Sequence, residues 1–401
     1  MFKLPFLNKT QKSDRFLTIH ISTSEVKCLA IYCENGIFKI IGHGIAELEP
    51  GNVRGGIIID KEKVATALQD TIEKATEHSE ETISDVIFGV GSNLCTSLMT
   101  TIRSKRAART PIEENELEDL YSKVNETAFI QAQNEFLEIT GDSETELVSI
   151  TSSNVYLKSE GQKVDSLIGK PAGVIEIAVF NSYAPNYHVK ALQQLAKKCE
   201  LDILAIGSEL YSLVQNIIQT NRETLDFVIL DIGTDYTNAA VVFSGGVVSN
   251  KSLNIGYSHF VDALNDRMGI TVEESRKILR TYLAGGLSQS EGFVVLEALR
   301  DVIEVWLLGL EMLFREFYGV KTFPSKIFIT GAGADIKEIL DSIKTEPWTK
   351  TVPFKSPPVF SKLSFSDLRD IVDSTSRVNK SEWVSAASLA VIYNEIGNQN
   401  D

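Results

Sequence analysis

Two segments of the chain share one pattern of apolar and polar positions. Residues 16–32 read FLTIHISTSEVKCLAIY, residues 227–243 read FVILDIGTDYTNAAVVF, and the two align without a gap. Each is an apolar run, a short polar turn and a second apolar run, which predicts two antiparallel strands joined by a tight turn. Because the pattern occurs in both halves of the chain, it predicts two similar domains that each contain such a hairpin.

The second hairpin carries residues suited to binding a phosphate. Its first apolar run ends in Asp231-Ile-Gly233-Thr. A glycine lets backbone N–H groups face an anion, and an aspartate beside it can hold Mg²⁺ through water. A third segment, KIFITGAGA at residues 326–334, is an apolar strand that runs into small residues, and these permit close approach of a ligand.

Periodicity predicts the remaining elements. Residues 110–113, Thr-Pro-Ile-Glu, are typical of a capping box with Pro111 at the first helical position, so we expect a helix from there through Val124. Further strands are expected at 86–91, 147–156, 174–180 and 201–206, and helices after Asp60 and at 188–198, 209–219, 262–287, 292–318 and 386–393.

Composition narrows the classes of function. The chain has 401 residues, 43% of them hydrophobic, and a net charge of −15, which argues against a nucleic-acid partner. Its four cysteines form no Cys-x-x-Cys pair, so we expect reduced thiols and a cytoplasmic protein. The segment MFKLPFLNKTQK is either a flexible leader or a weak membrane contact through Phe2, Leu4, Phe6 and Leu7.

A basic run stands out in this acidic chain. It contains Arg103, Lys105, Arg106 and Arg109. The run is either a solvated loop or a contact with an acidic neighbour such as another copy of the chain. In the second case Arg106 and Arg109 are the expected self-assembly residues.

The order of hairpin, hairpin and Gly-rich turn is similar to that of the actin-like superfamily. Three further segments resemble the bacterial cell-division FtsA family. They are GNVRGGIIIDKEKV at 51–64, DSLIGKPAG at 165–173 and NIGYSHFVDALNDRMGITVEES at 254–275. The resemblance covers nearly the whole chain.

The resemblance implies an α/β fold with two actin-like (ribonuclease H-like) domains around a nucleotide cleft. An inserted α+β subdomain is expected within the first domain. The implied boundaries are a leader at 1–15, the first domain at 16–51 and 182–224, the insertion at 52–181, the second domain at 225–261 and 323–401, and a mostly helical subdomain at 262–322.

The resemblance also implies ATP and Mg²⁺ as ligands and an adaptor function. Such a protein self-assembles and links the C-terminal tail of FtsZ to the inner face of the membrane, with other division proteins as further partners. Asp231 would hold Mg²⁺ through water. The implied nucleotide-binding residues are Thr23, Ser24, Asp231, Gly233, Thr234, Thr237, Gly256, Gly331, Ala332 and Gly333.

The chain departs from the family pattern in places that bear on catalysis. His20 and Ser22 stand where the family has Asp and Gly, Asp235 and Tyr236 enter the second turn, and Arg276 and Leu279 replace Glu and Lys near the adenosine. No catalytic residue is assigned. The expectation is therefore a weak ATPase at most, with ATP acting as a conformational ligand.

Two alternatives stay open. A PilM-like pilus-assembly protein that binds a membrane partner would suit a chain that ends soon after its closing helix. A sugar or acetate kinase of the same superfamily would need a catalytic base and a substrate pocket, and no such set of residues is evident.

Overall fold

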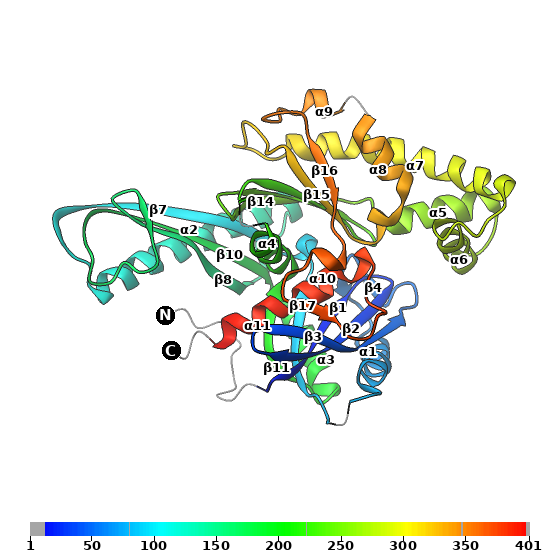
Figure 1. Ribbon diagram of the computed structural model, residues 1–401, viewed down its shortest axis with the longest axis horizontal. Coiled ribbons are helices and arrows are strands. Elements are labelled where there is room, and N and C mark those ends of the chain that lie inside the picture. Colours follow the sequence, from blue (N-terminus) through cyan, green and yellow to red (C-terminus); the bar gives the residue numbers. More distant parts are fainter. Residues whose placement is uncertain (1–12, 80, 222, 346–347, 398–401) are drawn as a thin grey trace.

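A computed structural model describes residues 13–79, 81–221, 223–345 and 348–397. The four apolar residues of the predicted membrane contact, Phe2, Leu4, Phe6 and Leu7, lie outside these ranges. The described part contains two large sheets, one above the other in Figure 1, and a separate sheet that extends to the left as an arm.

The first sheet has the strand order β11-β6-β1-β2-β3-β17. Strands β1 (Arg15–Ile21), β2 (Glu25–Glu34) and β3 (Ile37–Glu47) form an antiparallel meander, which contains the first predicted hairpin. Strands β6 (Asp85–Val90) and β11 (Asp202–Ser208) extend it in parallel on one side, and β17 (Ile371–Asp373) pairs in parallel with β3 on the other.

Helices cover both faces of this sheet. Helix α1 (Lys61–Thr76) lies directly on β3, because a Cβ on Gly42 or Gly44 would come within 1.9 Å of a helix carbonyl oxygen. Helix α3 (Asn186–Lys198) packs beside α1. Helices α4 (Glu209–Thr220), α10 (Val384–Ser388) and α11 (Ala390–Gly397) pack together, and the last two also contact strands of this sheet.

The second sheet repeats the plan of the first. Its order is β14-β13-β12-β15-β16, with β12 (Phe227–Ile232), β13 (Thr237–Phe243) and β14 (Gly246–Leu253) antiparallel, and β15 (Lys326–Thr330) and β16 (Val359–Lys362) parallel. The prediction of two hairpins in two similar domains is confirmed.

Helices α5 to α9 belong to the second domain. Helices α5 (Tyr257–Met268), α6 (Val272–Leu283) and α7 (Gln289–Arg315) lie between β14 and β15 in the chain. Helices α8 (Lys337–Thr345) and α9 (Trp348–Thr351) follow β15. The core of this domain includes Trp306 of α7, whose indole N–H donates to the Thr237 hydroxyl at 2.8 Å.

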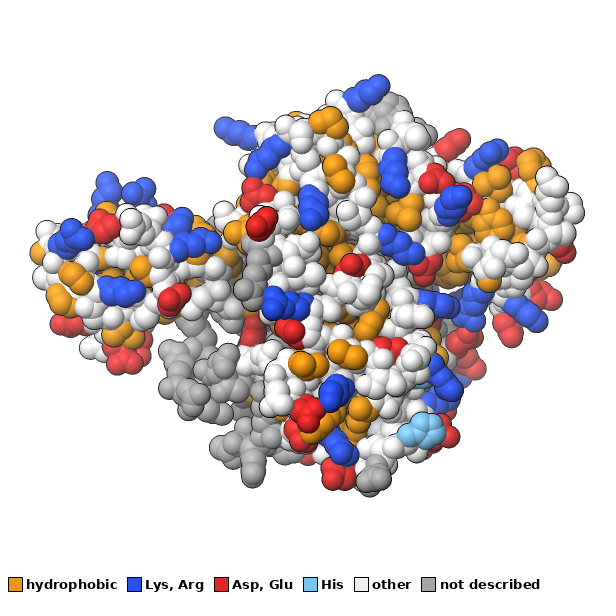
Figure 2. All heavy atoms as spheres, viewed as in Figure 1, with side chains coloured by type: hydrophobic (Ala, Val, Ile, Leu, Met, Phe, Trp, Pro, Cys, Tyr) orange, Lys and Arg blue, Asp and Glu red, His pale blue; other side chains and the backbone are white. Residues whose placement is uncertain are grey.

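The arm is a four-stranded sheet with one long helix. Strands β7 (Thr96–Pro111), β10 (Pro171–Pro185), β8 (Leu147–Ser159) and β9 (Gln162–Val164) are ordered β7-β10-β8-β9, and α2 (Glu114–Thr140) packs on β7 and β10. In the space-filling view the arm forms a lobe at the left (Figure 2).

The predicted capping box before α2 is wrong. Pro111 ends β7 and faces Pro171 of β10, and the Ile112 N–H donates to the Lys170 carbonyl oxygen at 3.1 Å. Because the backbone is still extended there, the helix starts later, at Glu114, with no side-chain cap.

The pairing of the strands bears on the domain boundaries. Helix α1 and strand β6 are part of the first domain, and so are β17, α10 and α11 near the end of the described chain. We therefore propose that the insertion begins at β7 rather than at residue 52, and that the first domain also includes residues 371–397.

Candidate nucleotide cleft

A cleft of about 830 Å³, including its open mouth, lies between the two large domains. Its walls come from the turn of the β1–β2 hairpin, the turn of the β12–β13 hairpin and the segment after β15. The predicted residues that line it are Thr23, Asp231, Gly233, Thr234, Gly331 and Ala332. Residues far apart in the sequence thus meet at one place, as the repeat predicts.

Glycine is required where the segment after β15 meets the second hairpin. Gly331 has φ +88°, and a Cβ there would lie 2.5 Å from Asp231 Oδ1. Gly331 lies between β15, which pairs in parallel with β12, and the short 3₁₀ helix η2 (Ala332–Asp335). A larger residue at position 331 would displace the carboxylate that is expected to face Mg²⁺.

Three predicted residues have packing positions instead of facing the cleft. Thr237 is buried, and its hydroxyl donates to the Ile255 carbonyl oxygen at 2.7 Å. A Cβ on Gly256 would lie 2.5 Å from the Thr234 carbonyl oxygen, and one on Gly333 would lie 2.2 Å from Ile232 Cγ2. These three residues hold the second hairpin against its neighbours.

Glu209 is a cleft residue that the sequence interpretation missed. It is the first residue of α4, directly after the carboxyl end of β11, and its carboxylate accepts from His20 Nδ1 at 2.6 Å. The two side chains are 8% and 21% exposed. Polar residues at the carboxyl ends of parallel strands commonly face ligands, and this position could have identified Glu209.

The His20–Glu209 pair is an ion pair when His20 is protonated. Burial lowers the pKa of His20, but the charge of Glu209 and the hydrogen bond to it raise this pKa by more, so the net shift is upward. When protonated, His20 therefore neutralises a carboxylate in the cleft.

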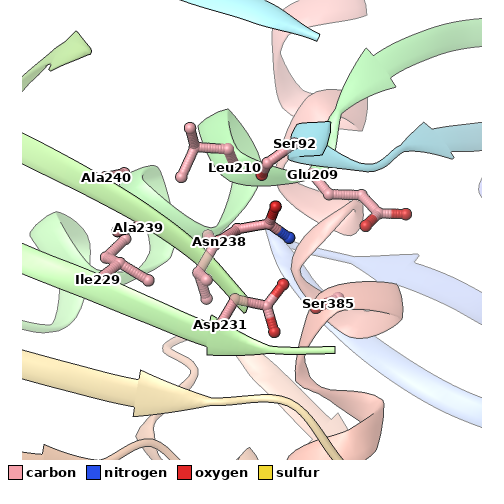
Figure 3. Close-up of a pocket in the computed structure, with 10 residues that line it drawn as sticks. Ser92, Glu209, Leu210, Ile229, Asp231, Asn238, Ala239, Ala240 and Ser385 are labelled. Carbon is pink, nitrogen blue, oxygen red and sulfur yellow. The ribbon is translucent and has the colours of Figure 1, made fainter. Parts of the chain in front are cut away.

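Asp231 lies across the cleft from this pair. Burial, followed by repulsion from Glu209, raises its pKa to about 6. Figure 3 shows the Asp231 carboxylate and the Asn238 amide pointing toward the side where Glu209 and Ser385 lie. Carboxylate and amide oxygens suit a hard divalent cation such as Mg²⁺, which would hold Asp231 in its ionised form.

Lys27 is the second cleft residue missed from sequence. It is buried on β2, lies 2.6 Å from Glu25 and donates to the Glu382 carbonyl oxygen at 3.1 Å. The cleft also contains the carboxylates of Glu25, Glu209, Asp231, Asp235 and Glu382, so acidic groups outnumber Lys27 and His20. These carboxylates would repel the phosphates of a nucleotide without a metal ion. The cleft therefore fits a nucleotide that carries a divalent cation better than one that does not.

A wider hollow of about 1830 Å³ continues the cleft outward. It is lined by Ser24, Thr234, Tyr257, Arg276 and Arg280 among others. Arg276 and Leu279 are the two residues that were expected near the adenosine. Leu279 is fully buried in the helical subdomain, and only Arg276 lines the hollow. Across its mouth, Arg280 lies 3.2 Å from Glu47 at the end of β3, which joins the two domains.

The described residues contain no group of three or more His, Cys, Asp or Glu side chains arranged to hold a metal ion, and none of their helices is both long and apolar enough to cross a bilayer. All four cysteines are free thiols, as the sequence predicted.

Sequence comparisons find similarity to a curated protein in two strains of the same organism. No protein-family model matches the chain. It is 24% identical to the cell division protein FtsA of two strains of Staphylococcus epidermidis over 276 residues, which is 67% of this chain and 54% of FtsA. The chain therefore matches about half the length of these curated relatives.

Structural comparisons identify the fold. A chain of the PilM-PilN type IV pilus biogenesis complex superposes with a TM-score of 0.66 at 14% identity, covering 94% of this chain and 98% of that chain. The ethanolamine utilization protein EutJ of Carboxydothermus hydrogenoformans superposes with a TM-score of 0.50 at 10% identity, covering 96% of this chain and 92% of EutJ. The chain has the actin-like ATPase fold, and its sequence is similar to that of the cell division protein FtsA.

Proposed function

We propose that this chain is an FtsA-like adaptor that binds MgATP, self-assembles and links FtsZ to the inner face of the membrane. The observation that carries the proposal is the meeting of two hairpins and a Gly-rich turn at one interdomain cleft, in a chain similar to FtsA in sequence. Adaptors of this kind need a cleft that changes with its ligand and a surface that takes a partner.

The cleft residues suggest a division of roles. Asp231 would hold Mg²⁺, which supplies the positive charge that the phosphates need. Thr23, Ser24, Gly233 and Thr234 would face the phosphates from the two turns. Gly331 and Ala332 would lie against the nucleoside, where small residues permit close approach.

The electrostatics favour ATP as a conformational ligand. A general base must be free to accept a proton, and the Glu209 carboxylate is already hydrogen-bonded to His20. Hydrolysis is therefore expected to be weak at most. A ligand that touches both hairpins binds the closed cleft better than an open one, and this difference in affinity shifts the population toward the closed form.

Helix α7 offers a surface for a protein partner. Val305, Leu308 and Met312 follow one another at helical spacing and are 56%, 65% and 64% exposed. Neighbouring exposed large apolar side chains are uncommon on monomers and are typical of docking sites. We propose that this apolar stripe, Val305, Leu308 and Met312, takes the partner's segment.

The PilM-like alternative is favoured by one observation. The structural match to the PilM-PilN complex covers nearly all of both chains, whereas the sequence match to FtsA covers 54% of FtsA. On this alternative, the apolar stripe would take a segment of a PilN-like partner in place of the FtsZ tail.

One titration separates the two proposals. A fluorescent peptide of the FtsZ C-terminal tail is titrated with the protein in the presence of MgATP, and overlapping peptides that cover PilN are titrated in parallel. Saturable micromolar binding of the FtsZ peptide supports the division adaptor. Binding of a PilN peptide alone supports the pilus alternative.

A further inference from the structure

The residues of the basic run, which lie on β7, point to different faces of the arm sheet. Side chains alternate along β7, so Arg106 points to the face covered by α2 while Arg103 and Lys105 point to the opposite face. Arg106 donates to Glu116 at 2.7 Å and to the Ala172 carbonyl oxygen at 2.6 Å, and its side chain is only 12% exposed. Arg106 is therefore bound within the arm and is not available to a neighbour.

The face of the arm sheet opposite α2 carries a row of cations. In the register of the strands, Glu176 on β10 faces Arg103 on β7 and Lys158 on β8, and Lys158 faces Lys163 on β9. Arg103 and Lys163 are exposed, and Lys105 on the same side of β7 is exposed as well. We define Arg103, Lys105, Lys158 and Lys163 as the basic sheet face.

One carboxylate and one aromatic ring lie among these cations. Glu176 pairs with Lys158 at 2.7 Å, and the Tyr156 ring has the ammonium groups of Lys158 and Lys163 at 4.0 and 5.7 Å from its centre. Glu176 neutralises one cation, and the others remain in excess. Figure 2 shows several Lys and Arg side chains over the arm.

The outer surface of α2 has the opposite charge. Its sequence, ENELEDLYSKVNETAFIQAQNEFLEIT, contains Lys123 as its one basic residue. Two acidic residues are used internally, since Glu116 pairs with Arg106 and Glu135 pairs with Lys251 of β14. The exposed carboxylates without an ion pair in the described structure are Glu114, Glu118, Asp119, Glu126 and Glu138, which we define as the acidic helix face.

We infer that the arm is a head-to-tail connector between copies of this chain. The acidic helix face of one copy lies on the basic sheet face of the next, where opposite charges attract and wrong registers bring like charges together. The two faces lie on opposite sides of one arm, so each copy can bind two others. A heterologous contact that does not close on itself produces an open-ended chain of subunits.

A second copy fits these observations better than an anionic membrane. A membrane would attract the basic sheet face, but it would leave the acidic helix face without a partner and would repel a chain of net charge −15. A second copy satisfies both faces with one contact. The inference rests on the self-assembly part of the proposed function and names its surface.

Charge reversal tests the connector. Sedimentation velocity with MgATP at low salt compares wild type, a sheet variant (Arg103→Glu with Lys163→Glu) and a helix variant (Glu118→Lys with Glu126→Lys). All four positions are exposed, so folding should be preserved, and circular dichroism checks this. We expect each variant to weaken self-association at least tenfold, and the chain that carries all four changes to recover association within about threefold of wild type.

A mixing experiment and a matched control complete the design. Equal amounts of the sheet and helix variants should co-assemble. The unchanged acidic helix face of the sheet variant attracts the unchanged basic sheet face of the helix variant, and the two reversed faces also carry opposite charges. The control is Lys190→Glu with Lys197→Glu, exposed lysines on α3 outside the arm, which should associate like wild type.

Several outcomes would overturn the connector. One is a wild-type chain that stays monomeric, and another is charge reversals that leave self-association unchanged. A third is a chain with all four changes that associates as weakly as the sheet variant or the helix variant. Loss of binding to anionic phosphatidylglycerol vesicles in the sheet variant, with association unchanged, would assign the basic sheet face to lipid instead. Binding of the FtsZ or PilN peptide by the same samples reports separately on the partner role.

Discussion

His20 and Glu209 form a hydrogen-bonded pair on the first-domain wall of the cleft, with His20 Nδ1 2.6 Å from Glu209 Oε1. The two residues come from β1 and from the start of α4, 189 positions apart in the sequence. The charges that face His20 are Glu209, Lys27 and Glu25, with Asp231 across the cleft. Stability should therefore depend on whether His20 carries a proton.

We predict a pH-dependent contribution from His20. Because its pKa is raised in the folded protein, its stabilisation is fully present below the unfolded pKa of about 6.5 and is lost as pH rises through the folded pKa. His20→Gln keeps a hydrogen-bond donor but cannot titrate. Urea unfolding at pH 6 and pH 9 should show a larger deficit of the variant at pH 6, and an equal deficit at both would contradict the assignment.

Asp231 should be required for MgATP. Replacing Asp231 with Asn keeps its shape but removes the charge that would face the metal, so we expect at least a tenfold loss of affinity in calorimetry, equal to about 1.4 kcal/mol. Because the pKa of Asp231 is raised to about 6, wild-type affinity should also fall as pH decreases through 6. Asp341→Asn, an exposed residue of α8, is the control, and equal affinities of the two variants would remove Asp231 from the site.

Gly331→Ala should damage both stability and binding. The residue has φ +88°, and the new Cβ would lie 2.5 Å from Asp231 Oδ1. We expect a loss of about 2 kcal/mol or more in the free energy of unfolding, together with weaker MgATP binding. Gly285→Ala separates conformation from contact, because Gly285 has φ +70° with no atom within 4 Å of the added Cβ. A similar loss for both variants would rule out the steric explanation.

Arg106 should stabilise the arm without contributing to assembly. Its guanidinium binds Glu116 and the carbonyl oxygens of Pro111 and Ala172, so Arg106→Ala removes one donor from all three acceptors. We expect a loss of about 2 kcal/mol in urea unfolding followed by circular dichroism. Arg109, which is 69% exposed, is the matched control, and Arg109→Ala should be nearly neutral. A neutral Arg106→Ala would show that the network is dispensable.

The apolar stripe on α7 should be needed for partner binding. Leu308→Glu places a charge at the centre of the stripe, where it would have to be desolvated, so we expect at least a tenfold weaker complex with whichever FtsZ or PilN peptide binds the wild type. The side chain is 65% exposed, so the fold should tolerate the change. Phe293→Glu, on the same helix but outside the stripe and 60% exposed, should bind normally. Unchanged affinity of Leu308→Glu would place the partner elsewhere.

The sequence predicts local structure well where pattern and pairing agree. The two hairpins, the strand into Gly331 and most helices follow from periodicity, because each buries one continuous apolar face. The error at Pro111 arose because the same residues suit a helix start and a strand end, and pairing with Pro171 decides between them. Pairing of distant strands also returns β17 to the first domain.

The cleft was predicted less completely than the fold. Asp231 and Gly233 lie in a turn whose small and polar residues suggest a binding site. Thr237 belongs to the same polar segment, but it is buried and accepts a hydrogen bond from Trp306. Lys27 lies in ordinary apolar surroundings in the sequence, and only the fold brings it to the cleft, whereas Glu209 had the weaker signal of its place after a predicted strand. Side chains that act through tertiary neighbours cannot be identified from local pattern alone.

The return of β17 to the first sheet means that the chain passes between the large domains twice, once between α4 and β12 and again between β16 and β17. Two covalent connections constrain relative motion more than one, since a single tether allows a domain to swivel in any direction. With two, the easiest motion is rotation about the line that joins them. Opening of the cleft would thus be a rotation of one domain about the line through the two connections. A small change in domain spacing near that line would then produce a larger displacement at the outer ends of the domains.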